Sequence, residues 1–299
     1  MNKPYTALLL SVFLWATTFA ATKLSLTEIL PVSLAFFRFL IASVLFLAII
    51  KLNAEYQNLI RAFKKDLLYF LLLGFIGIAL MYILENFAIK YTTTSQAAII
   101  MNADPIIIAI LSAIFIKEKM DISRIGGIII GFTGVTLVVF NQGDLIALIS
   151  SDNFAGNILA LLSSFAWAVY TVMIKNKVEE YGPLVVTTAS SVFGVFFLFF
   201  SVLLIEGLPD IPLFSFESWL LILYLGIVIS VLSFYLWNYA LEHLEASKVG
   251  FYWFLVPVIA IMIGIIFFKE SLNVLMIVGT LLIFIGVYLV EKRKSRTDC

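Results

Sequence analysis

The chain has 299 residues, of which 63% are hydrophobic and only 13% are charged, and its mean hydropathy is +1.10. A water-soluble fold has too little interior to hide this much apolar surface, so the composition excludes a soluble domain. The 19 basic and 19 acidic residues give a net charge of zero, which offers no support for nucleic acid as a partner. The only cysteine, Cys299, has no partner for an internal disulfide.

Ten apolar segments follow one another along the chain, each about as long as a ~30 Å hydrocarbon layer requires at ~1.5 Å per helical residue. Lipid offers no hydrogen-bond partner to a free backbone amide, so every segment is predicted to be a helix. The predicted helices are 5–24, 31–50, 67–88, 96–116, 122–140, 156–174, 183–205, 217–238, 247–268 and 272–291. The predicted fold class is an all-α membrane protein with ten transmembrane helices.

The second half of the chain repeats the first half at a constant offset of 152 residues. Identical residues at this offset are Trp15 and Trp167, Lys23 and Lys175, Pro31 and Pro183, Gly74 and Gly226, Asn86 and Asn238, and Gly127 and Gly279. Each half, 1–147 and 148–299, carries five predicted helices. Because five is odd, the second half enters the membrane from the opposite side, which predicts two inverted five-helix repeats. The first segment has its counterpart at 157–176, so we expect it to be retained rather than cleaved as a signal peptide.

The basic residues predict the orientation in the membrane. If the N-terminus is cytoplasmic, 15 of the 19 basic residues lie on the inner side, and only Lys23, Lys90 and Lys269 lie outside. Arg38 lies within a predicted helix. The excess of inner Lys and Arg follows the positive-inside rule, so both termini are predicted to be cytoplasmic and the plasma membrane is the expected location.

Several motifs, some of them duplicated, carry a resemblance to a known family. They are the paired Trp15 and Trp167, the run Phe37-Arg38-Phe39, the run Ala88-Ile89-Lys90-Tyr91-Thr92, Pro105 with Lys117-Glu118, Pro257 with Lys269-Glu270, and the glycine-spaced fifth and tenth helices. In order and spacing, the chain resembles the EamA branch of the drug/metabolite transporter superfamily. The resemblance implies a central cavity surrounded by helices 1, 3, 4, 6, 8 and 9, with helices 5 and 10 packed at the edge. It also implies transport of small metabolites, amino acids or drugs, often outward.

Polar and aromatic side chains form a stripe on the first helix and a matching stripe on the sixth. The stripes consist of Ser11, Trp15, Thr18 and Thr22, and of Ser163, Trp167 and Tyr170. Their helical spacing puts each set on one face, which should avoid lipid and face the bundle. Two interpretations remain open: a cavity wall that stacks on a substrate, or interhelical packing in which the hydroxyls bond to their own backbone.

Three charged residues lie inside predicted helices: Arg38, Glu85 and Asp104. Each costs from ~3 to more than ~10 kcal/mol in the hydrocarbon unless it is paired or hydrated, so each is a functional candidate. Their counterparts in the second half are Ser190, Trp237 and Val256, so the fold itself does not require the charges. Arg38 and Asp104 lie at similar depth, which allows a structural ion pair. Alternatively, Arg38 binds a substrate carboxylate, or Asp104 exchanges a proton.

The remaining candidate residues differ in the face of the helix on which they lie. Tyr82 on the third helix is predicted to line the substrate site. Glu85 shares a face with it, and is expected to be either a proton site or a solvated group at the outer mouth. Asn102 is predicted to face the bundle one turn before Pro105, as a ligand, with Asp104 roughly opposite to it. Asn86 and Asn238 recur in both halves, which favours a structural role for them.

The absence of other motifs limits the chemistry. The lone histidine, His243, is predicted to lie in a loop, so no histidine-based metal site or catalytic triad is expected, and there is no phosphate-binding loop. We therefore expect no enzyme, no cofactor and no metal, but a secondary transporter whose partners are a small-molecule substrate and the lipid bilayer.

Amino acids are the leading substrate class. The alternatives are efflux of cationic or amphiphilic drugs and, from another class, a membrane scaffold or embedded enzyme. Monomers are the default, and the glycine faces of helices 5 and 10 also permit a dimer.

The orientation is testable with reporter fusions. A reporter that is active only in the cytoplasm should be active at both ends of the chain, because ten crossings return the chain to its starting side. A periplasm-specific reporter at the same two positions is the control. Opposite locations of the two ends would contradict the predicted inverted repeats.

Overall fold

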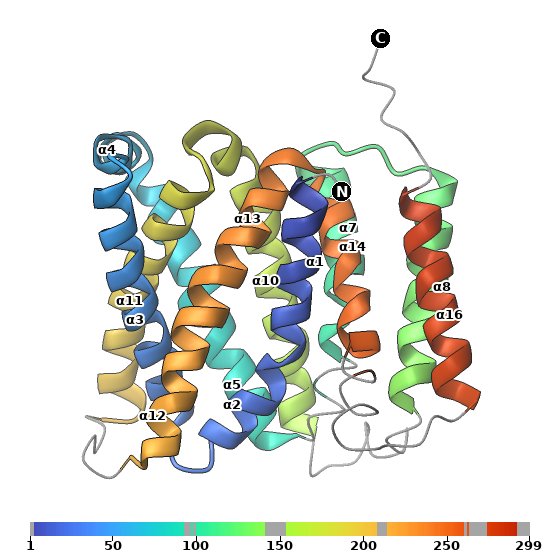
Figure 1. The fold of residues 1–299 in the computed structure, drawn as a ribbon, viewed down its shortest axis with the longest axis horizontal. Coiled ribbons are helices and arrows are strands. Elements are labelled where there is room, and N and C mark those ends of the chain that lie inside the picture. The colour runs from blue at the N-terminus through green and yellow to red at the C-terminus, as the bar shows by residue number, and fades with distance from the viewer. Residues whose placement is uncertain are drawn as a thin grey trace.

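The computed structural model describes residues 3–92, 97, 100–140, 154–207, 214–259, 262 and 274–291. The elements within these ranges are helices that stand side by side in one bundle (Figure 1). In chain order they are α1 (Lys3–Ala16), α2 (Thr18–Ser25), α3 (Pro31–Leu52), α4 (Tyr56–Leu73), η1 (Gly74–Leu80), α5 (Met81–Tyr91), α7 (Asp104–Phe115), α8 (Ile122–Phe140), α10 (Phe154–Tyr181), α11 (Pro183–Ile205), α12 (Phe216–Leu223), η3 (Tyr224–Ser233), α13 (Phe234–His243), α14 (Ala246–Phe251), η4 (Tyr252–Phe254) and α16 (Val274–Glu291).

Apolar helices of membrane-spanning length dominate the described residues. Six stretches are long and apolar enough to cross a bilayer: Lys3–Ser25, Pro31–Leu52, Tyr56–Tyr91, Phe154–Tyr181, Pro183–Ile205 and Phe216–His243. Four shorter apolar helices accompany them: Asp104–Phe115, Ile122–Leu137, Ala246–Ile259 and Val274–Val290. These stretches fall on the predicted segments, which confirms an all-α membrane protein. Parts of the predicted helices 96–116 and 247–268 lie outside the described residues.

The first predicted helix, 5–24, is interrupted at Thr17, between α1 and α2. The Thr17 hydroxyl lies 2.6 Å from the Leu14 carbonyl oxygen, to which it donates, and 2.5 Å from the Tyr224 hydroxyl. A threonine hydroxyl that bonds to a helical carbonyl bends the helix, and here the polar contact to Tyr224 holds the bend in place. The interruption separates Trp15 from Thr18, two predicted site residues.

The third predicted helix, 67–88, is longer in the structure, because α4, η1 and α5 form one stretch over Tyr56–Tyr91. Its first turns lie across the end of the bundle, where Figure 1 shows them nearly end-on. Asp66 has non-helical angles, φ −128° and ψ 33°, so the chain turns there into the bundle. The charged residues before Asp66, predicted to be a loop, are therefore helical.

A π-helical stretch interrupts the third helix of each half, η1 in the first and η3 in the second, and the two coincide at the offset of 152 residues. A Cβ atom on Gly74 would lie 2.6 Å from Cβ of Phe193 on α11. A Cβ atom on Gly226 would lie 3.1 Å from Cβ of Ile41 on α3. These glycines allow the same close helix crossing twice, each time between a helix of one half and a helix of the other.

Lysines at repeat positions fasten two helix ends. Lys23 Nζ donates to the Ile89 carbonyl near the end of α5, at 2.7 Å. Lys175 Nζ donates to the Leu241 carbonyl near the end of α13, also at 2.7 Å. The last carbonyls of a helix lack backbone partners and carry partial negative charge, so a cation stabilises them.

Glu118 of the Lys117-Glu118 motif fastens another helix. Its carboxylate accepts hydrogen bonds from the backbone N–H groups of Ala246 and Ser247, at 2.6 and 3.0 Å. These are the first residues of α14, whose N–H groups have no intrahelical partner and favour an anion. The motif therefore has a structural role in attaching α14 to the segment that follows α7.

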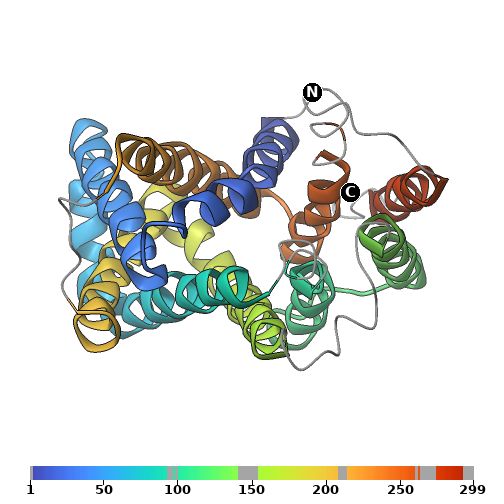
Figure 2. The same ribbon diagram turned by 90° about the horizontal axis from the view of Figure 1, so that it is seen from below.

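The glycine-bearing helices α8 and α16 pack against each other at one side of the bundle (Figure 2). A Cβ atom on Gly134 would lie 2.6 Å from the Gly279 carbonyl oxygen, and one on Gly127 would lie 2.9 Å from the Gly286 carbonyl oxygen. The two backbones therefore approach more closely than any other residue would permit. The glycine faces are used within the chain, as expected for intramolecular packing.

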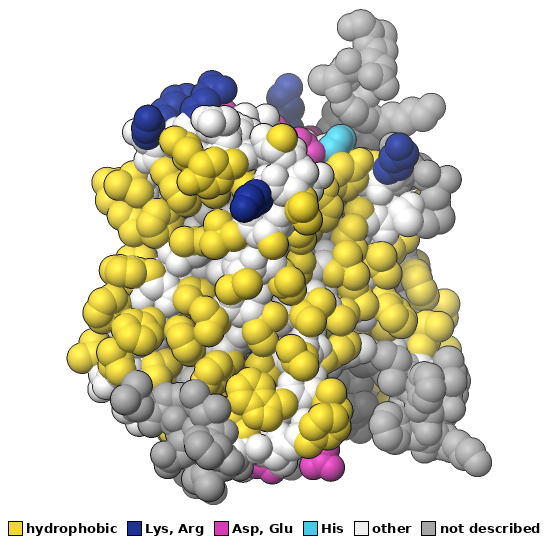
Figure 3. Space-filling model, turned by 60° about the vertical axis from the view of Figure 1, so that its left-hand side comes forward, with side chains coloured by type: hydrophobic (Ala, Val, Ile, Leu, Met, Phe, Trp, Pro, Cys, Tyr) yellow, Lys and Arg dark blue, Asp and Glu magenta, His cyan; other side chains and the backbone are white. Residues whose placement is uncertain are grey.

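The two ends of the bundle differ in charge. Helix α1 begins at the same end of the bundle at which α16 ends (Figure 1). On the face drawn in Figure 3, the Lys and Arg side chains lie toward this end, and hydrophobic side chains cover the middle of the molecule. This band of apolar side chains with basic groups at one end matches the charge distribution predicted from the sequence.

The α8–α16 contact predicts the effect of a small substitution. Gly134→Ala should lower the free energy of unfolding by about 1–3 kcal/mol, because the new methyl group meets backbone atoms that have little room to move. Gly126→Ala on the same helix is the matched control, since a Cβ atom there has no neighbour within 4 Å. Thermal unfolding in detergent measures both. Equal stability of the two variants would contradict the close packing.

Candidate functional site

A small enclosed cavity lies within the bundle, between helices of both halves of the chain. Its described lining consists of Trp15, Thr18, Phe19, Arg38, Met81, Tyr82, Glu85, Met101, Asp104, Ser163, Ser164, Trp167 and Trp253. The free volume is about 30 Å³. This is room for a water molecule or two and not for a metabolite.

Tryptophan side chains form the apolar wall of the cavity. Trp15 packs edge-on against Trp167, with ring centroids 5.5 Å apart and an interplanar angle of 89°. The centroid of Trp253 lies 5.2 Å from that of Trp15. Such pairs contribute about 0.5–1.5 kcal/mol beyond the apolar area that they bury, so they hold the wall in a defined shape. The predicted positions of Trp15, Thr18, Ser163 and Trp167 at a cavity are thus found together in the structure.

Arg38 is held in place by two helices of different halves. Its Nε donates to the Ser230 hydroxyl on η3 at 2.5 Å, and its Nη2 donates to the Tyr82 hydroxyl on α5 at 3.3 Å. The guanidinium carbon also lies 4.4 Å from the centroid of the Tyr82 ring, a cation–π distance. The side chain is almost fully buried, at 2% exposure. Tyr82 thus both lines the cavity and orients the cation.

The suggested ion pair between Arg38 and Asp104 is not formed. Both residues are described, and no ion pair within 4 Å joins them. Hydrogen bonds to neutral hydroxyls from neighbouring helices take the place of the expected carboxylate. No carboxylate of the described residues lies within 4 Å of the Arg38 guanidinium nitrogen atoms.

Two carboxylates line the cavity, Glu85 from α5 and Asp104 from the start of α7. Asp104 is 4% exposed, and its Oδ1 atom has no hydrogen-bond partner in the described part of the chain. A buried carboxylate oxygen without a partner is costly, which makes the group a candidate for contact with a bound solute or a proton.

The predicted roles of Asn102 and Asp104 are exchanged. Asn102 is buried but is not part of the described cavity lining, whereas Asp104 is. The prediction assumed one regular helix over 96–116. Instead, 102 and 103 form a turn, and α7 begins at Asp104 with Pro105 in its first turn. The turn changes the helical phase, so the acid, rather than the amide, faces the cavity.

Tyr170 stands behind the cavity rather than in its wall. Its ring stacks on Trp167 with centroids 5.5 Å apart and an interplanar angle of 30°. A Cβ atom on Gly77 would lie 2.0 Å from the Tyr170 ring, so the ring occupies the space that this glycine leaves. In this structure Tyr170 lies outside the described cavity lining and packs against Trp167, so its predicted contact with substrate stays a prediction.

Sequence reasoning missed four lining residues: Phe19, Met101, Ser164 and Trp253. Met101 and Trp253 are counterparts at the repeat offset, so the repeat could have identified both positions. Phe19 lies one turn after Trp15, at the edge of the predicted stripe. No sequence feature marked Ser164 as a site residue, apart from its position next to Ser163.

The duplicated asparagines are structural, as expected. Asn86 Nδ2 donates to the Pro31 carbonyl at the start of α3, at 2.8 Å. Asn238 Nδ2 donates to the Thr187 hydroxyl at 2.7 Å, and that hydroxyl donates to the Pro183 carbonyl at the start of α11. Both asparagines thus tie the third helix of a half to the beginning of the second.

The described residues contain no cluster of three or more His, Cys, Asp and Glu side chains that could hold a metal ion. The predicted loop position of His243 is wrong, because it is the last residue of α13. Its Nδ1 atom lies 2.9 Å from the Tyr239 carbonyl of the preceding turn. The histidine is thus part of a helix end and not of the cavity.

A multi-pass helical bundle that collects charged groups in an enclosed internal cavity is the architecture of a membrane transporter. Two stretches of the chain, residues 2–140 and 154–291, match the EamA-like transporter family. The protein belongs to this family.

Relatives cover nearly the whole chain. A protein of Archaeoglobus fulgidus described as an uncharacterized transporter is 31% identical over 295 residues, which are 98% of this chain and 100% of the relative. The uncharacterized transporter YyaM of Bacillus subtilis is 29% identical over 280 residues, or 93% of this chain and 89% of that protein. A solved crystal structure superposes with a TM-score of 0.81 at 17% identity, covering 98% and 97% of the two chains, and has the same fold.

The partner of Arg38 can be tested by double-mutant cycles. Arg38→Met combined with Ser230→Ala should show a coupling energy of about 1.5–3 kcal/mol, the usual range for a hydrogen bond to a charged group. The cycle of Arg38→Met with Asp104→Asn is the comparison and should give a smaller coupling. The free energy of unfolding in detergent is the measured quantity. A larger coupling energy of Arg38 with Asp104 than with Ser230 would show that Arg38 pairs with Asp104 instead.

Proposed function

We propose that this protein is a secondary transporter that exports small zwitterionic metabolites, with amino acids as the leading substrate class. One observation carries the proposal: charged groups of both signs, Arg38 and the acids Glu85 and Asp104, line one enclosed cavity whose remaining wall is largely aromatic. A zwitterion presents a carboxylate and an ammonium group at a fixed short separation. A cavity with both charges can replace the hydration of both ends.

Arg38 is suited to the substrate carboxylate. A guanidinium has five N–H donors in a planar fork, and the described hydrogen bonds to Ser230 and Tyr82 use two of its three nitrogen atoms. Donors therefore remain for a carboxylate, while the two bonds in place fix the direction of the fork. Preorganised donors of this kind lower the entropic cost of binding.

The two carboxylates complete the proposed site. Asp104, with an unpartnered oxygen, is suited to bind the ammonium group, and Glu85 is suited to exchange a proton during the cycle. Trp15, Trp167 and Trp253 would contact the apolar part of the substrate. The free volume of about 30 Å³ requires these side chains or their helices to move before a metabolite can enter.

The proposed mechanism requires two inverted five-helix repeats, 1–147 and 148–299, that rock around the cavity. Reciprocal contacts between the two halves support this symmetry. Gly74 packs against α11, and its counterpart Gly226 packs against α3. In the same way, Gly127 packs against Gly286 and Gly134 packs against Gly279. A two-fold relation produces such reciprocal pairs, because the counterparts of two contacting positions are also in contact.

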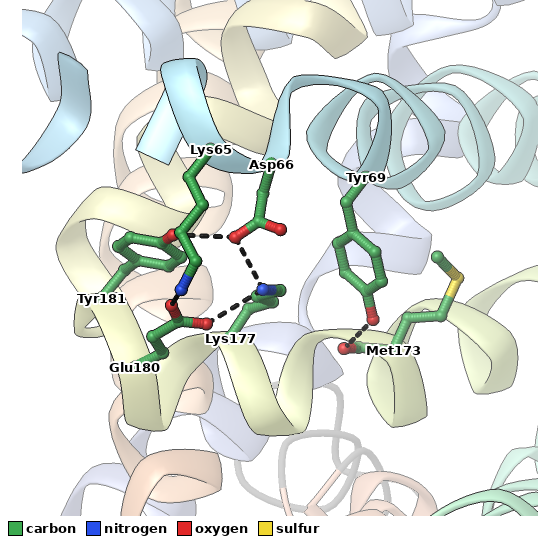
Figure 4. A network of polar contacts seen from close by, with 7 residues as sticks. All are labelled: Lys65, Asp66, Tyr69, Met173, Lys177, Glu180 and Tyr181. Atoms are coloured by element: carbon green, nitrogen blue, oxygen red, sulfur yellow. Dashed lines mark hydrogen bonds and ion pairs between the residues drawn. The ribbon is translucent and has the colours of Figure 1, made fainter. Parts of the chain in front are cut away.

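Alternating access further requires a closure at each end of the bundle. At the basic end, α4 is fastened to α10 by the network in Figure 4. Lys177 Nζ binds Asp66 at 2.7 Å and Glu180 at 2.9 Å, and Lys65 Nζ binds Glu180 at 2.5 Å. The Tyr181 hydroxyl also donates to Asp66, at 2.7 Å. This set of bonds would have to break for the cavity to open at this end.

The equivalent position at the other end has a different closure. The Glu28 carboxylate, 152 residues before Glu180, accepts bonds from the Ser218 hydroxyl at 2.7 Å and the Ser215 N–H at 3.0 Å. These bonds hold the pKa of the Glu28 carboxyl below its usual range. The Glu206 carboxylate, after the end of α11, accepts further bonds at this end from the Val32 N–H, the Ser33 N–H and the Ser33 hydroxyl, at 2.7, 2.8 and 2.7 Å. With the basic end in the cytoplasm of a plasma-membrane protein, opening at this other end would release substrate outward.

A second candidate function, efflux of small cations by a monomer of the same fold, has an observation in its favour. Two carboxylates and several aromatic faces are the groups that recognise an organic cation, and with both acids ionised they outnumber Arg38. The two functions differ in their need for the guanidinium. Removal of Arg38 should abolish transport of a zwitterion and leave transport of a cation intact or faster.

Uptake into proteoliposomes tests the proposal. Wild-type protein should transport members of a neutral amino acid panel, and Arg38→Gln and Asp104→Asn should each slow initial uptake by about tenfold or more, as expected from loss of a charge-assisted hydrogen bond. Glu217→Gln, which removes an exposed acid at the start of α12, is the matched control and should transport normally. Background uptake of every amino acid, or full activity of Arg38→Gln, would contradict the zwitterion assignment.

A further inference from the structure

The first turns of α4 form a helix on the end surface of the bundle, with one basic face. A shallow hollow of about 380 Å³ is lined there by Gln57, Ile60, Arg61, Lys64 and Lys65. These positions follow the spacing i, i+3, i+4, i+7 and i+8, which places all five side chains on one side of a helix. Leu59 and Ala62, on the opposite side, are buried against the bundle.

The hollow carries positive charge that the protein does not neutralise. Arg61 and Lys64 are exposed, and neither makes an ion pair within the described residues. Lys65 is 57% exposed and pairs with Glu180, which also binds Lys177. Two uncompensated cations therefore face outward from one hollow, and their charge is complementary to a phosphate group.

Exposed apolar side chains follow the basic face along the chain. After the turn at Asp66, Leu68 is 71% exposed, and Leu72 and Phe75 are each 42% exposed. They lie on α4 and the start of η1, which run from the end surface into the apolar band of the bundle. Cations on the end surface, followed along the chain by exposed apolar side chains, are the groups that suit the head and the acyl chains of a phospholipid.

We propose that the hollow formed by Arg61 and Lys64 binds the phosphate headgroup of an anionic phospholipid, whose acyl chains lie along Leu68, Leu72 and Phe75. The commitment to a lipid rather than a soluble phosphate rests on these apolar side chains, which a soluble anion would not use. Lys65 borders the same hollow and holds Glu180 of the closure at this end. A bound headgroup would thus lie beside the contact between α4 and α10.

Thermal unfolding of the full-length protein in detergent tests the site, with phosphatidylglycerol, phosphatidylcholine or inorganic phosphate added. Phosphatidylglycerol should raise the unfolding midpoint, and the concentration needed should increase by about 30-fold in the double variant Arg61→Gln/Lys64→Gln, the loss expected for two surface cations. Lys65 stays unchanged so that its ion pair is kept. Lys3→Gln/Lys51→Gln removes two exposed cations at the same end and should respond like wild type.

Each alternative outcome overturns the proposal. Equal stabilisation by inorganic phosphate would show a site for a soluble anion, and equal loss in both double variants would show a general effect of surface charge. Native mass spectrometry of the wild-type protein supplies a measurement that needs no variant. It should retain phosphatidylglycerol in preference to phosphatidylcholine, and equal retention would also overturn the proposal.

Discussion

An ionised side chain within the hydrocarbon of a bilayer must be shielded, and this constraint organises the centre of the protein. Arg38, Glu85 and Asp104 come from three separate helices of the first half, and all three line one cavity. Each would cost from ~3 to more than ~10 kcal/mol if it faced lipid. The three side chains share one cavity away from lipid. The hydroxyls of Ser230 and Tyr82 bond to Arg38 and replace part of the hydration that it loses. The second half supplies Trp167 and Trp253, which form part of the apolar wall of the same cavity.

The halves share their scaffold but not their cavity chemistry. Lys23 and Lys175 each bind a carbonyl near the end of an equivalent helix, and Asn86 and Asn238 tie equivalent helices together. None of the three buried charges is duplicated. Duplicated residues thus belong to a framework that the two halves share, while unduplicated residues give the cavity its polarity. The closures at the two ends have also diverged, from a set of ion pairs at Glu180 to hydrogen bonds from serines at Glu28.

The sequence predicted most of the fold because hydrophobic length and the repeat offset are strong signals that tertiary context rarely overrides. Helix 183–205 was predicted to the residue. The failures arise where a helix is irregular. The turn at 102 and 103 exchanged the faces of Asn102 and Asp104, and the kink at Asp66 hid a surface helix among charged residues.

At the candidate site, residue types were easier to predict than contacts. Trp15, Thr18, Arg38, Tyr82, Glu85 and Trp167 were all expected from buried polarity and helical phase, and they lie together. The partner of Arg38 was not predictable, because Ser230 is one of many serines and lies 192 residues away. The packing of the Tyr170 ring into the space beside Gly77 was also not predictable, because it depends on a side chain that Gly77 lacks and on packing in three dimensions.

The central claim is that one cavity becomes accessible from both sides of the membrane. Cys299 is the only cysteine, so Cys299→Ser gives a background in which a single new thiol can be followed. In that background, Thr18→Cys places a thiol in the cavity wall. The rate of its reaction with a membrane-impermeant thiol reagent should be measured in right-side-out and inside-out vesicles. We predict reaction from both sides, slowed by a transported amino acid; reaction from one side only, unaffected by any substrate, would contradict the account.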